Sequence, residues 1–403
     1  MKILHIVRRF TQEAWGGIES HVLDLCQELT KLGHQNTILC TKALDSVPLE
    51  RIPKAAKIRR LDYYYPIFPL DQKTKLSLDY IGGDPFVREL ENNALSIKAD
   101  IIHFHTLCRF AKQTLQLAKK HSIPSILTLH GGVANIPKSE IKKFKKTKKF
   151  KLHYGRFFDW QLPNIHKEVD TVFCLNRQDL EFSKKINSNS ELITNAIRSD
   201  NFKVEKKTSF IKKYNIPINS KIILNVGRIE EQKNQFLLLQ AFYELQEPFT
   251  HLLIIGPINQ SEYYKEMKVF VKNKNLQNKV TIIPGLKKDD PDLIQAFKNS
   301  HVFVLCSTHE PFGIVVLEAW CAGLPVICTK TTGTSDLIKN KTNGILLEKH
   351  NTKELQAALQ TMLADKKMRE ILIQNAQRSL ADYEWPNVIK RIEKIYINLC
   401  INK

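Results

Sequence analysis

Short apolar runs alternate with longer segments of helical periodicity along the whole chain. Several runs are apolar at nearly every position, as is typical of parallel strands that helices cover on both faces. In the first half the pattern predicts strands at 2–7, 36–40, 100–104, 125–129 and 171–175. In the second half it predicts strands at 221–226, 251–255, 280–283, 302–305 and 325–328. The chain is therefore predicted to be an α/β protein with two doubly wound domains.

A polar, charged stretch without clear periodicity, 195–207, separates the two series of strands. It is predicted to link a domain of residues 1–200 to a second domain of residues 201–383. Near the end, Trp385-Pro386 breaks the pattern before a last helical segment with isoleucines at helical spacing. We expect this segment, 384–403, to return to the first domain.

Charge adds a constraint on partners, because the 403 residues carry a formal net charge of +20. Phosphate-bearing ligands, anionic lipid and nucleic acid would all suit such a protein. No recognised nucleic-acid module is visible, so nucleic acid is not an expected partner. The most basic stretch, 138–156, interleaves apolar residues and could dock on an anionic membrane surface or be a solvated loop. The lysines expected to face the membrane are Lys142, Lys143, Lys145, Lys146, Lys148 and Lys149.

The eight cysteines are scattered, mostly within apolar runs, and form no Cys-x-x-Cys pair. They are predicted to be reduced thiols in the core. No apolar run approaches the roughly 20 residues that a bilayer span needs, and the N-terminal run turns polar too early for a signal peptide. We therefore expect a cytoplasmic protein that associates peripherally with the inner face of the cytoplasmic membrane.

Two loops at the ends of predicted strands suit phosphate. Gly16-Gly17 follows the first strand and opens a helix, where small residues and a helix N-terminus favour anions, although such a pair is often only a turn. Arg228 and Lys233 follow the first strand of the second half. A guanidinium fork and a point charge suit the two phosphates of a diphosphate, and the alternative is an exposed basic loop.

Two carboxylates lie eight residues apart, Glu310 in a loop after the strand 302–305 and Glu318 on the following apolar helix. Such a separation suits hydrogen bonds to two different polyols better than a shared proton or metal. The alternative is a pair of structural helix carboxylates. His103 and His105 share one face of a strand, but no third ligand is evident, so no metal site is predicted.

The run Glu-Pro-Phe-Gly-Ile-Val-Val-Leu-Glu at 310–318 resembles the E-x7-E signature of the family 4 retaining glycosyltransferases. Further elements follow in the family's order: G-G-x-E at 16–19, D-I-I-H-F-H at 100–105, T-L-H-G at 128–131, G-R-x-x-x-x-K at 227–233 and G-L-P-V-I-C-T at 323–329. Thr334 departs from the pattern, since a second glycine commonly follows Gly333 there. The resemblance implies the GT-B fold, two Rossmann-like domains facing a cleft, with a C-terminal helix crossing back to the N-terminal domain.

The resemblance also implies roles for individual residues. Glu310 would contact the hydroxyls of the donor sugar, Glu318 the ribose, and Arg228 and Lys233 the diphosphate. Gly17 would line the diphosphate, and His130 would face the donor sugar, unless it is a core histidine. Phe312 and Gly313 would belong to the donor-binding loop. The residues expected to act in catalysis are Glu310, His130, Arg228 and Lys233.

A retaining, metal-independent hexosyl- or N-acetylhexosaminyl-transferase is therefore expected, with no cofactor and a UDP- or GDP-linked sugar as donor. Its acceptor would be a lipid-linked or saccharide hydroxyl in lipopolysaccharide, capsule or lipid-linked glycan assembly. Two alternatives stay open: a nucleotide-sugar epimerase or hydrolase of the same fold, and a catalytically silent protein that binds sugar nucleotides.

Overall fold

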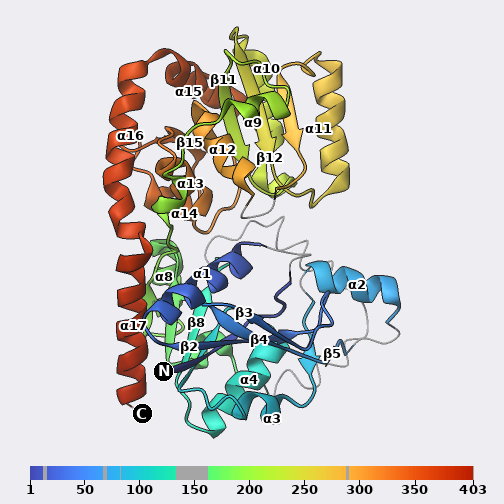
Figure 1. Ribbon diagram of the computed structural model, residues 1–403, viewed down its shortest axis with the longest axis vertical. Coiled ribbons are helices and arrows are strands. Elements are labelled where there is room, and N and C mark those ends of the chain that lie inside the picture. The colour runs from blue at the N-terminus through green and yellow to red at the C-terminus, as the bar shows by residue number, and fades with distance from the viewer. Residues whose placement is uncertain (12–15, 67–69, 82, 133–161, 287–289, 403) are drawn as a thin grey trace. The chain divides into compact units, whose positions relative to one another are not determined.

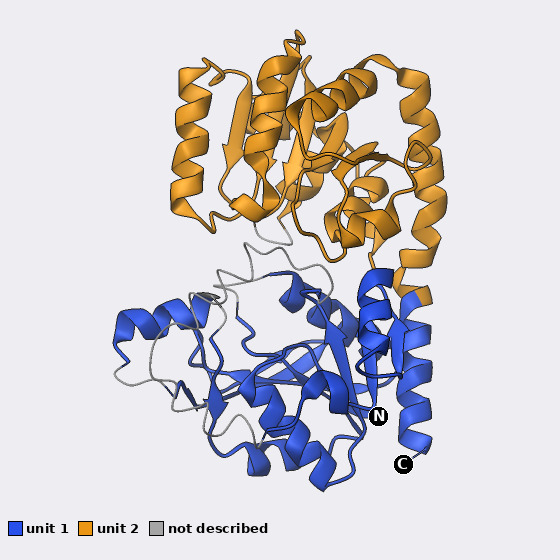
Figure 2. Ribbon diagram, turned by 180° about the vertical axis from the view of Figure 1, so that it is seen from behind, with its two compact units in different colours: residues 1–194, 388–403 blue, residues 195–387 orange. Residues whose placement is uncertain are grey.

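A computed structural model describes residues 1–11, 16–66, 70–81, 83–132, 162–286 and 290–402. The chain divides into two compact units (Figure 2). The first comprises Met1–Thr194 together with Val388–Lys403, and the second comprises Asn195–Asn387. The chain thus passes from one unit to the other twice.

The first unit is built on an eight-stranded sheet with the order β10-β9-β8-β7-β1-β2-β4-β3. All its neighbouring pairs are parallel except β3 with β4. The order reverses at β1, which lies between β2 and β7. The strands are β1 (Lys2–Ile6), β2 (Gln35–Thr41), β3 (Leu49–Ile52), β4 (Ala56–Leu61), β7 (Ile101–Phe104), β8 (Ser125–Leu129), β9 (Thr171–Cys174) and β10 (Ser190–Leu192).

Apolar clusters lie on both faces of this sheet. One contains Leu4 and Ile6 of β1 with Phe104, and the other contains Val7, Ile38 and Val22. A separate two-stranded ribbon consists of β5 (Tyr63–Tyr64) and β6 (Phe86–Val87). The described helices are α1 (Gly17–Lys31), α2 (Gln72–Ile81), α3 (Leu90–Leu95), α4 (Arg109–Lys120), α7 (Ile165–Glu168) and α8 (Arg177–Lys184).

The second unit contains a six-stranded, entirely parallel sheet with the order β13-β12-β11-β14-β15-β16. Counted along the chain this is 3-2-1-4-5-6, the doubly wound order of nucleotide-binding sheets, which reverses between β11 and β14. The strands are β11 (Lys221–Val226), β12 (Thr250–Ile255), β13 (Val280–Ile283), β14 (Val302–Leu305), β15 (Val326–Thr329) and β16 (Ile345–Leu347).

Helices cover this second sheet, and their apolar faces form one large core with the strands (Figure 1). Leu238, Leu252 and Leu359 are all fully buried there. The helices are η2 (Ser199–Phe202), α9 (Thr208–Lys213), η3 (Glu231–Lys233), α10 (Gln235–Leu245), α11 (Ser261–Asn273), α12 (Pro291–Asn299), α13 (Ile314–Cys321), α14 (Thr332–Leu337), α15 (Thr352–Ala364), α16 (Lys366–Leu380) and η4 (Ala381–Tyr383).

The predicted fold class is confirmed, and all ten predicted strands are present with bounds within one residue. The sequence pattern missed β3, β4, β10 and β16, and the ribbon of β5 and β6. Four of these six are only two or three residues long, and β4 carries three basic residues. One of them, Arg60, is buried because Asp45 and Glu50 pair with it at 2.8 and 2.7 Å.

The last helix, α17 (Trp385–Ile401), belongs to the first unit from Val388 onward. The Tyr396 hydroxyl lies 2.6 Å from Nδ1 of His103, and the Arg391 guanidinium donates to the Leu192 carbonyl at 2.6 Å. The predicted linker packs within the second unit, where Ile197 forms a bridge with Glu384 and the Phe202 ring meets Phe297.

Two of the sequence observations have structural counterparts, and a third falls outside the described residues. All eight cysteines are free, and six of them are buried. Among the helices that the structure describes, none is both long and apolar enough to cross a membrane. The lysines at 142–149 that were expected to face a membrane lie outside the described residues.

Candidate functional site

The loop after β11 lies at the point where the strand order of the second sheet reverses, the edge at which open α/β sheets bind ligands. Arg228 is half-exposed, and its guanidinium contacts Glu230 Oε1 at 2.9 Å. Asn259, from the loop after β12, donates a hydrogen bond to the other oxygen of Glu230. The buried Glu230 therefore orients the guanidinium, while half of the Arg228 side chain stays exposed and can meet an anion.

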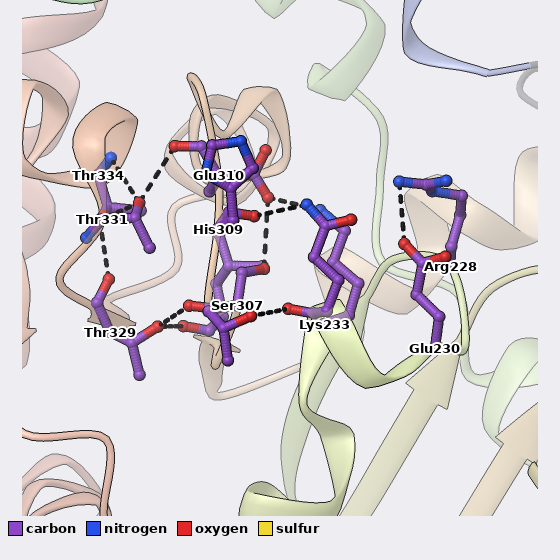
Figure 3. Close-up of polar contacts among 12 residues, drawn as sticks. Arg228, Glu230, Lys233, Ser307, His309, Glu310, Thr329, Thr331 and Thr334 are labelled. Carbon is purple, nitrogen blue, oxygen red and sulfur yellow. Dashed lines mark hydrogen bonds and ion pairs between the residues drawn. The ribbon is translucent and has the colours of Figure 1, made fainter. Parts of the chain in front are cut away.

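Lys233 and Glu310 come together across the reversal point, one from the loop after β11 and the other from the loop after β14. Lys233 Nζ lies 2.6 Å from Glu310 Oε2, and Ser307 Oγ lies 3.3 Å from the same oxygen (Figure 3). Both side chains of the ion pair are only 13–14% exposed. Two residues 77 positions apart thus form one polar centre.

Hydrogen bonds also join the two loops directly. Thr308 donates its backbone N–H to the Gln232 carbonyl at 2.9 Å, and the Gln232 amide donates to the His309 carbonyl at 3.1 Å. The Gln235 side-chain amide donates a hydrogen bond to the Arg228 carbonyl at 2.8 Å. These contacts fix the loop geometry independently of the ion pair, as a site that must be preorganised requires.

The backbone of Glu310 is held from a third strand end, because the Gly333 N–H donates to its carbonyl at 2.8 Å. The Thr331 and Thr332 hydroxyls reach the same carbonyl at 3.2 Å. Glycine is needed at 333, since a Cβ there would lie 2.3 Å from the Phe312 backbone nitrogen. The loops after β11, β14 and β15 therefore position one carboxylate.

The other predicted donor-binding residues of this unit lie in different surroundings. Phe312 is buried with its ring near Tyr383, so a ligand would meet the backbone at this position. Gly313 has a φ of +95°, which favours glycine, and precedes the first residue of α13. Glu318 is half-buried on α13.

Thr334 compensates locally for the glycine expected after Gly333. Its side chain is fully buried, and its hydroxyl donates to the Thr329 carbonyl at 2.8 Å and accepts from the Thr331 N–H at 2.8 Å. Thr331 caps α14 in turn. A glycine at position 334 would leave the backbone flexible, whereas the Thr334 hydroxyl holds this loop with two hydrogen bonds.

In the first unit, Gly17 is the first residue of α1, directly after Gly16. A Cβ added to Gly17 would meet nothing within 4 Å, so the position borders open space. Glu19 turns back to accept a hydrogen bond from the Gly16 N–H at 3.0 Å, and Arg9 lies 3.8 Å from its other oxygen. Burial raises the pKa of Glu19 above its usual value.

His130 follows β8, and a group of histidines surrounds it in the first unit. Its Nε2 lies 3.0 Å from Nδ1 of His105, and its ring is 4.9 Å from the ring of His21. Burial, together with the neighbouring His21, lowers the pKa of His130 well below its usual value. Histidines at 5, 103 and 105, and at 21, 105 and 130, bring their ring nitrogens within 4.8 Å. No third ligand beside His103 and His105 is evident from the sequence alone.

The structure brings Arg228, Lys233 and Glu310 together in the second unit, and places Gly17 and His130 in the first. Sequence reasoning missed Glu230, which lies inside the G-R-x-x-x-x-K segment and orients Arg228. Its signal is a pair of acidic residues, Glu230 and Glu231, between two cations at a strand end. It also missed His5, which the strand register places beside His103, and His21, which lies on α1.

Two family models match adjoining parts of the chain. Glycosyltransferase Family 4 matches residues 15–200, and Glycosyl transferases group 1 matches residues 206–379. Together they span nearly all of the first unit's main segment and most of the second unit.

Individual proteins give the same picture. A glycosyltransferase of Methanocaldococcus jannaschii is 24% identical over 98% of both chains. A UDP-Gal:alpha-D-GlcNAc-diphosphoundecaprenol alpha-1,3-galactosyltransferase of Escherichia coli is 27% identical over 76% of this chain and 77% of its own. Among solved structures, sucrose-phosphate synthase from Thermosynechococcus elongatus superposes with a TM-score of 0.76 at 19% identity, over 100% of both chains.

Proposed function

The protein belongs to the family 4 glycosyltransferases and has their GT-B fold, and from this premise we propose that it is a retaining enzyme acting on a nucleoside diphosphate sugar. The proposal rests mainly on the Lys233–Glu310 ion pair beside Arg228 at the reversal point of the second sheet. Two cations suit a diphosphate, and a carboxylate suits the hydroxyls of a sugar. In the free protein the ion pair keeps both groups in place.

In the proposed reaction, Arg228 and Lys233 stabilise the negative charge that grows on the leaving diphosphate. The bond between the anomeric carbon and the phosphate oxygen breaks, and the bond to the acceptor oxygen forms on the same face of the sugar. The acceptor proton passes to the departing phosphate, so no protein nucleophile is needed. In other enzymes a divalent metal can neutralise such a diphosphate. Here we propose that the two cations do so, and that neither metal nor cofactor is required.

The donor is proposed to be a UDP-hexose or UDP-N-acetylhexosamine, with GDP sugars as the alternative. The printed name of the Escherichia coli relative contains both a UDP sugar and a diphosphoundecaprenol-linked acceptor. With the net charge of +20, this supports an acceptor hydroxyl on a lipid-linked glycan at the inner membrane face. The lysines at 142–149 are proposed to contact the anionic lipid.

The test is an assay of nucleoside diphosphate release from UDP, GDP and ADP sugars in the presence of EDTA. The wild type is expected to consume one class of donor. Glu310→Ala is expected to lower turnover on the order of 100-fold or more, because it removes the sugar contact and leaves Lys233 without its carboxylate.

Glu370→Ala is the matched control, because Glu370 pairs with Lys366 on the exposed side of α16 in the same unit. Its turnover should equal that of the wild type. Full activity of Glu310→Ala would contradict the assigned site, and loss of wild-type activity in EDTA would contradict metal independence.

A further inference from the structure

Polar side chains form a ladder across one face of the first sheet. The register pairs His5 of β1 with His103 of β7, and His5 with Ile38 of β2. Because side chains alternate between faces, His5 shares its face with Asn36, His103, His105 and His130. His5, His103 and His105 are at most 2% exposed, which is unusual for so many imidazoles in one place.

Asn36 lies at the inner end of this ladder, and its orientation is fixed. Its amide nitrogen donates to the Cys26 carbonyl at 2.9 Å, to Thr30 Oγ1 at 3.0 Å and to the Ala55 carbonyl at 3.3 Å. Backbone carbonyls can only accept, so the amide NH2 must face them. Its oxygen therefore faces His5, whose Nε2 lies 3.2 Å away.

This oxygen determines where the proton of His5 lies. An amide oxygen only accepts, so Nε2 of His5 must carry a hydrogen. Burial lowers the pKa of His5 to about 4, so at neutral pH the ring carries one hydrogen and its Nδ1 is bare. Nδ1 of His5 lies 3.2 Å from Nε2 of His105, which must therefore donate.

The same logic continues to the outer end of the ladder. Burial lowers the pKa of His105 well below its usual value, so His105 also carries a single hydrogen, on Nε2. Its bare Nδ1 lies 3.0 Å from Nε2 of His130, which must then donate to it. The hydrogen of His130 is thus on Nε2, and its Nδ1 has no hydrogen-bond partner among the described residues.

We propose that the chain Asn36–His5–His105–His130 sets the tautomer of His130, so that it presents a bare Nδ1 as a hydrogen-bond acceptor to a sugar hydroxyl. His5 and His105 are then positioning residues, and the ligand they prepare for is a polyol. The inference rests on the proposed function for its ligand, the donor sugar, and on the expectation from the sequence resemblance that His130 faces this sugar. The direction of the chain itself depends only on the contacts within the first unit.

The opposite direction and a metal-loaded cluster are both incompatible with these contacts. A reversed chain would set the bare Nε2 of His5 against the Asn36 oxygen, two acceptors with no hydrogen between them. A metal ion in either histidine group would need a lone pair of His105. The only lone pair of that ring accepts from His130, so a metal would have to break the chain.

The test is ¹⁵N spectroscopy of the free, metal-free wild-type protein at pH 7.5 with labelled histidine. His5, His105 and His130 are expected to show a protonated Nε2 and a bare Nδ1. Buried His251, whose Nε2 contacts Thr281 in the second unit, serves as the internal reference. A protonated Nδ1 on His130 would overturn the proposal. Zn²⁺ added to the metal-free protein would also overturn it if one equivalent bound and shifted the ¹⁵N signals of His105 and His130.

A matched pair of variants tests the coupling. In His5→Phe the acceptor for His105 is lost, so His130 should populate both tautomers and donor turnover should fall several-fold. In His5→Gln the amide can still accept from His105 and donate to Asn36, so the His130 signal and turnover should be closer to the wild type. His251 should not change in either variant.

The two proposals can fail separately. If no donor is consumed but the ¹⁵N pattern is as expected, the hydrogen-bond chain from Asn36 to His130 is supported and the proposed function is refuted. If donors are consumed while His130 shows the other tautomer, only the proposed hydrogen-bond chain is refuted. An unchanged His130 signal in His5→Phe would also refute it.

Discussion

At the scale of single residues, Gly17 and Gly333 differ in how much space surrounds them. A Cβ on Gly17 would meet nothing within 4 Å, whereas one on Gly333 would lie 2.3 Å from the Phe312 nitrogen. The absence of a side chain at Gly333 is therefore explained by the fold. At Gly17 the described residues offer no such explanation, which is what a position reserved for a ligand would show.

This contrast predicts opposite outcomes for two alanine variants. Gly17→Ala should leave the thermal unfolding temperature unchanged and lower donor turnover about tenfold or more, because the methyl group displaces the diphosphate. Gly333→Ala should lower the free energy of unfolding by about 1–3 kcal/mol, because backbone must move. Calorimetry and the donor assay distinguish the two. Wild-type turnover of Gly17→Ala would show that the donor does not approach this glycine.

Residue-scale chemistry was also the least predictable from the sequence. The common placement of Arg228, Lys233 and Glu310 could be predicted because strand ends are visible in the pattern and parallel strands bring their ends to one edge. The role of Glu230 depends on Asn259, which reaches it from another loop. The histidine ladder depends on register, and nothing in a linear pattern states which residue of β1 lies beside His103.

At the scale of elements, the long buried strands were predictable and the short edge strands were not. Strands such as β14 are apolar throughout because helices cover both faces. Strands β10 and β16 have three residues each, too few to show a period. In β4 a buried Arg60 takes a core position because carboxylates and carbonyls surround it.

The buried histidines of the ladder on the first sheet make the stability of the first unit depend on pH. In the unfolded chain these histidines take up protons near pH 6.5, whereas burial lowers the pKa of His5 to about 4 and those of His103, His105 and His130 well below 6.5. The unfolded state therefore binds more protons below pH 6.5. The first unit should lose stability as the pH falls from about 6.5 to 4, by at most about 1.4 kcal/mol per pH unit for each histidine.

Amide hydrogen exchange at pH 7 and pH 5, corrected for intrinsic rates, measures this effect strand by strand. Protection of β1 and β7 should fall more than that of β11 and β12, because the second unit has fewer histidines with lowered pKa, His251 and His301. An equal loss in both sheets would contradict the assignment of the effect to the ladder.

At the scale of the whole molecule, the excess of 61 basic over 41 acidic residues predicts binding to anionic vesicles. The protein should sediment with phosphatidylserine vesicles at low salt, and not with phosphatidylcholine vesicles or at 0.5 M salt, where screening removes the attraction. If the segment 138–156 is responsible, Glu at Lys142, Lys145 and Lys149 should abolish binding.

The control replaces three exposed lysines of α11, Lys265, Lys268 and Lys272, with Glu. This variant has the same net charge as the first. If both variants lose binding equally, overall charge and not the segment is responsible. If neither loses binding, the proposed lysine contact with lipid is wrong.

The double passage of the chain between the units has a consequence for its synthesis. Residues 1–194 leave the ribosome first, yet their unit also needs residues 388–403, which emerge only after the entire second unit. At ordinary translation rates this interval lasts roughly 10–40 s. Throughout it, His103 lacks the hydroxyl of Tyr396 and that face of the sheet lacks α17. The first half of the nascent chain therefore remains an incomplete domain until α17 is synthesised. It is most exposed to chaperones and proteases in that interval.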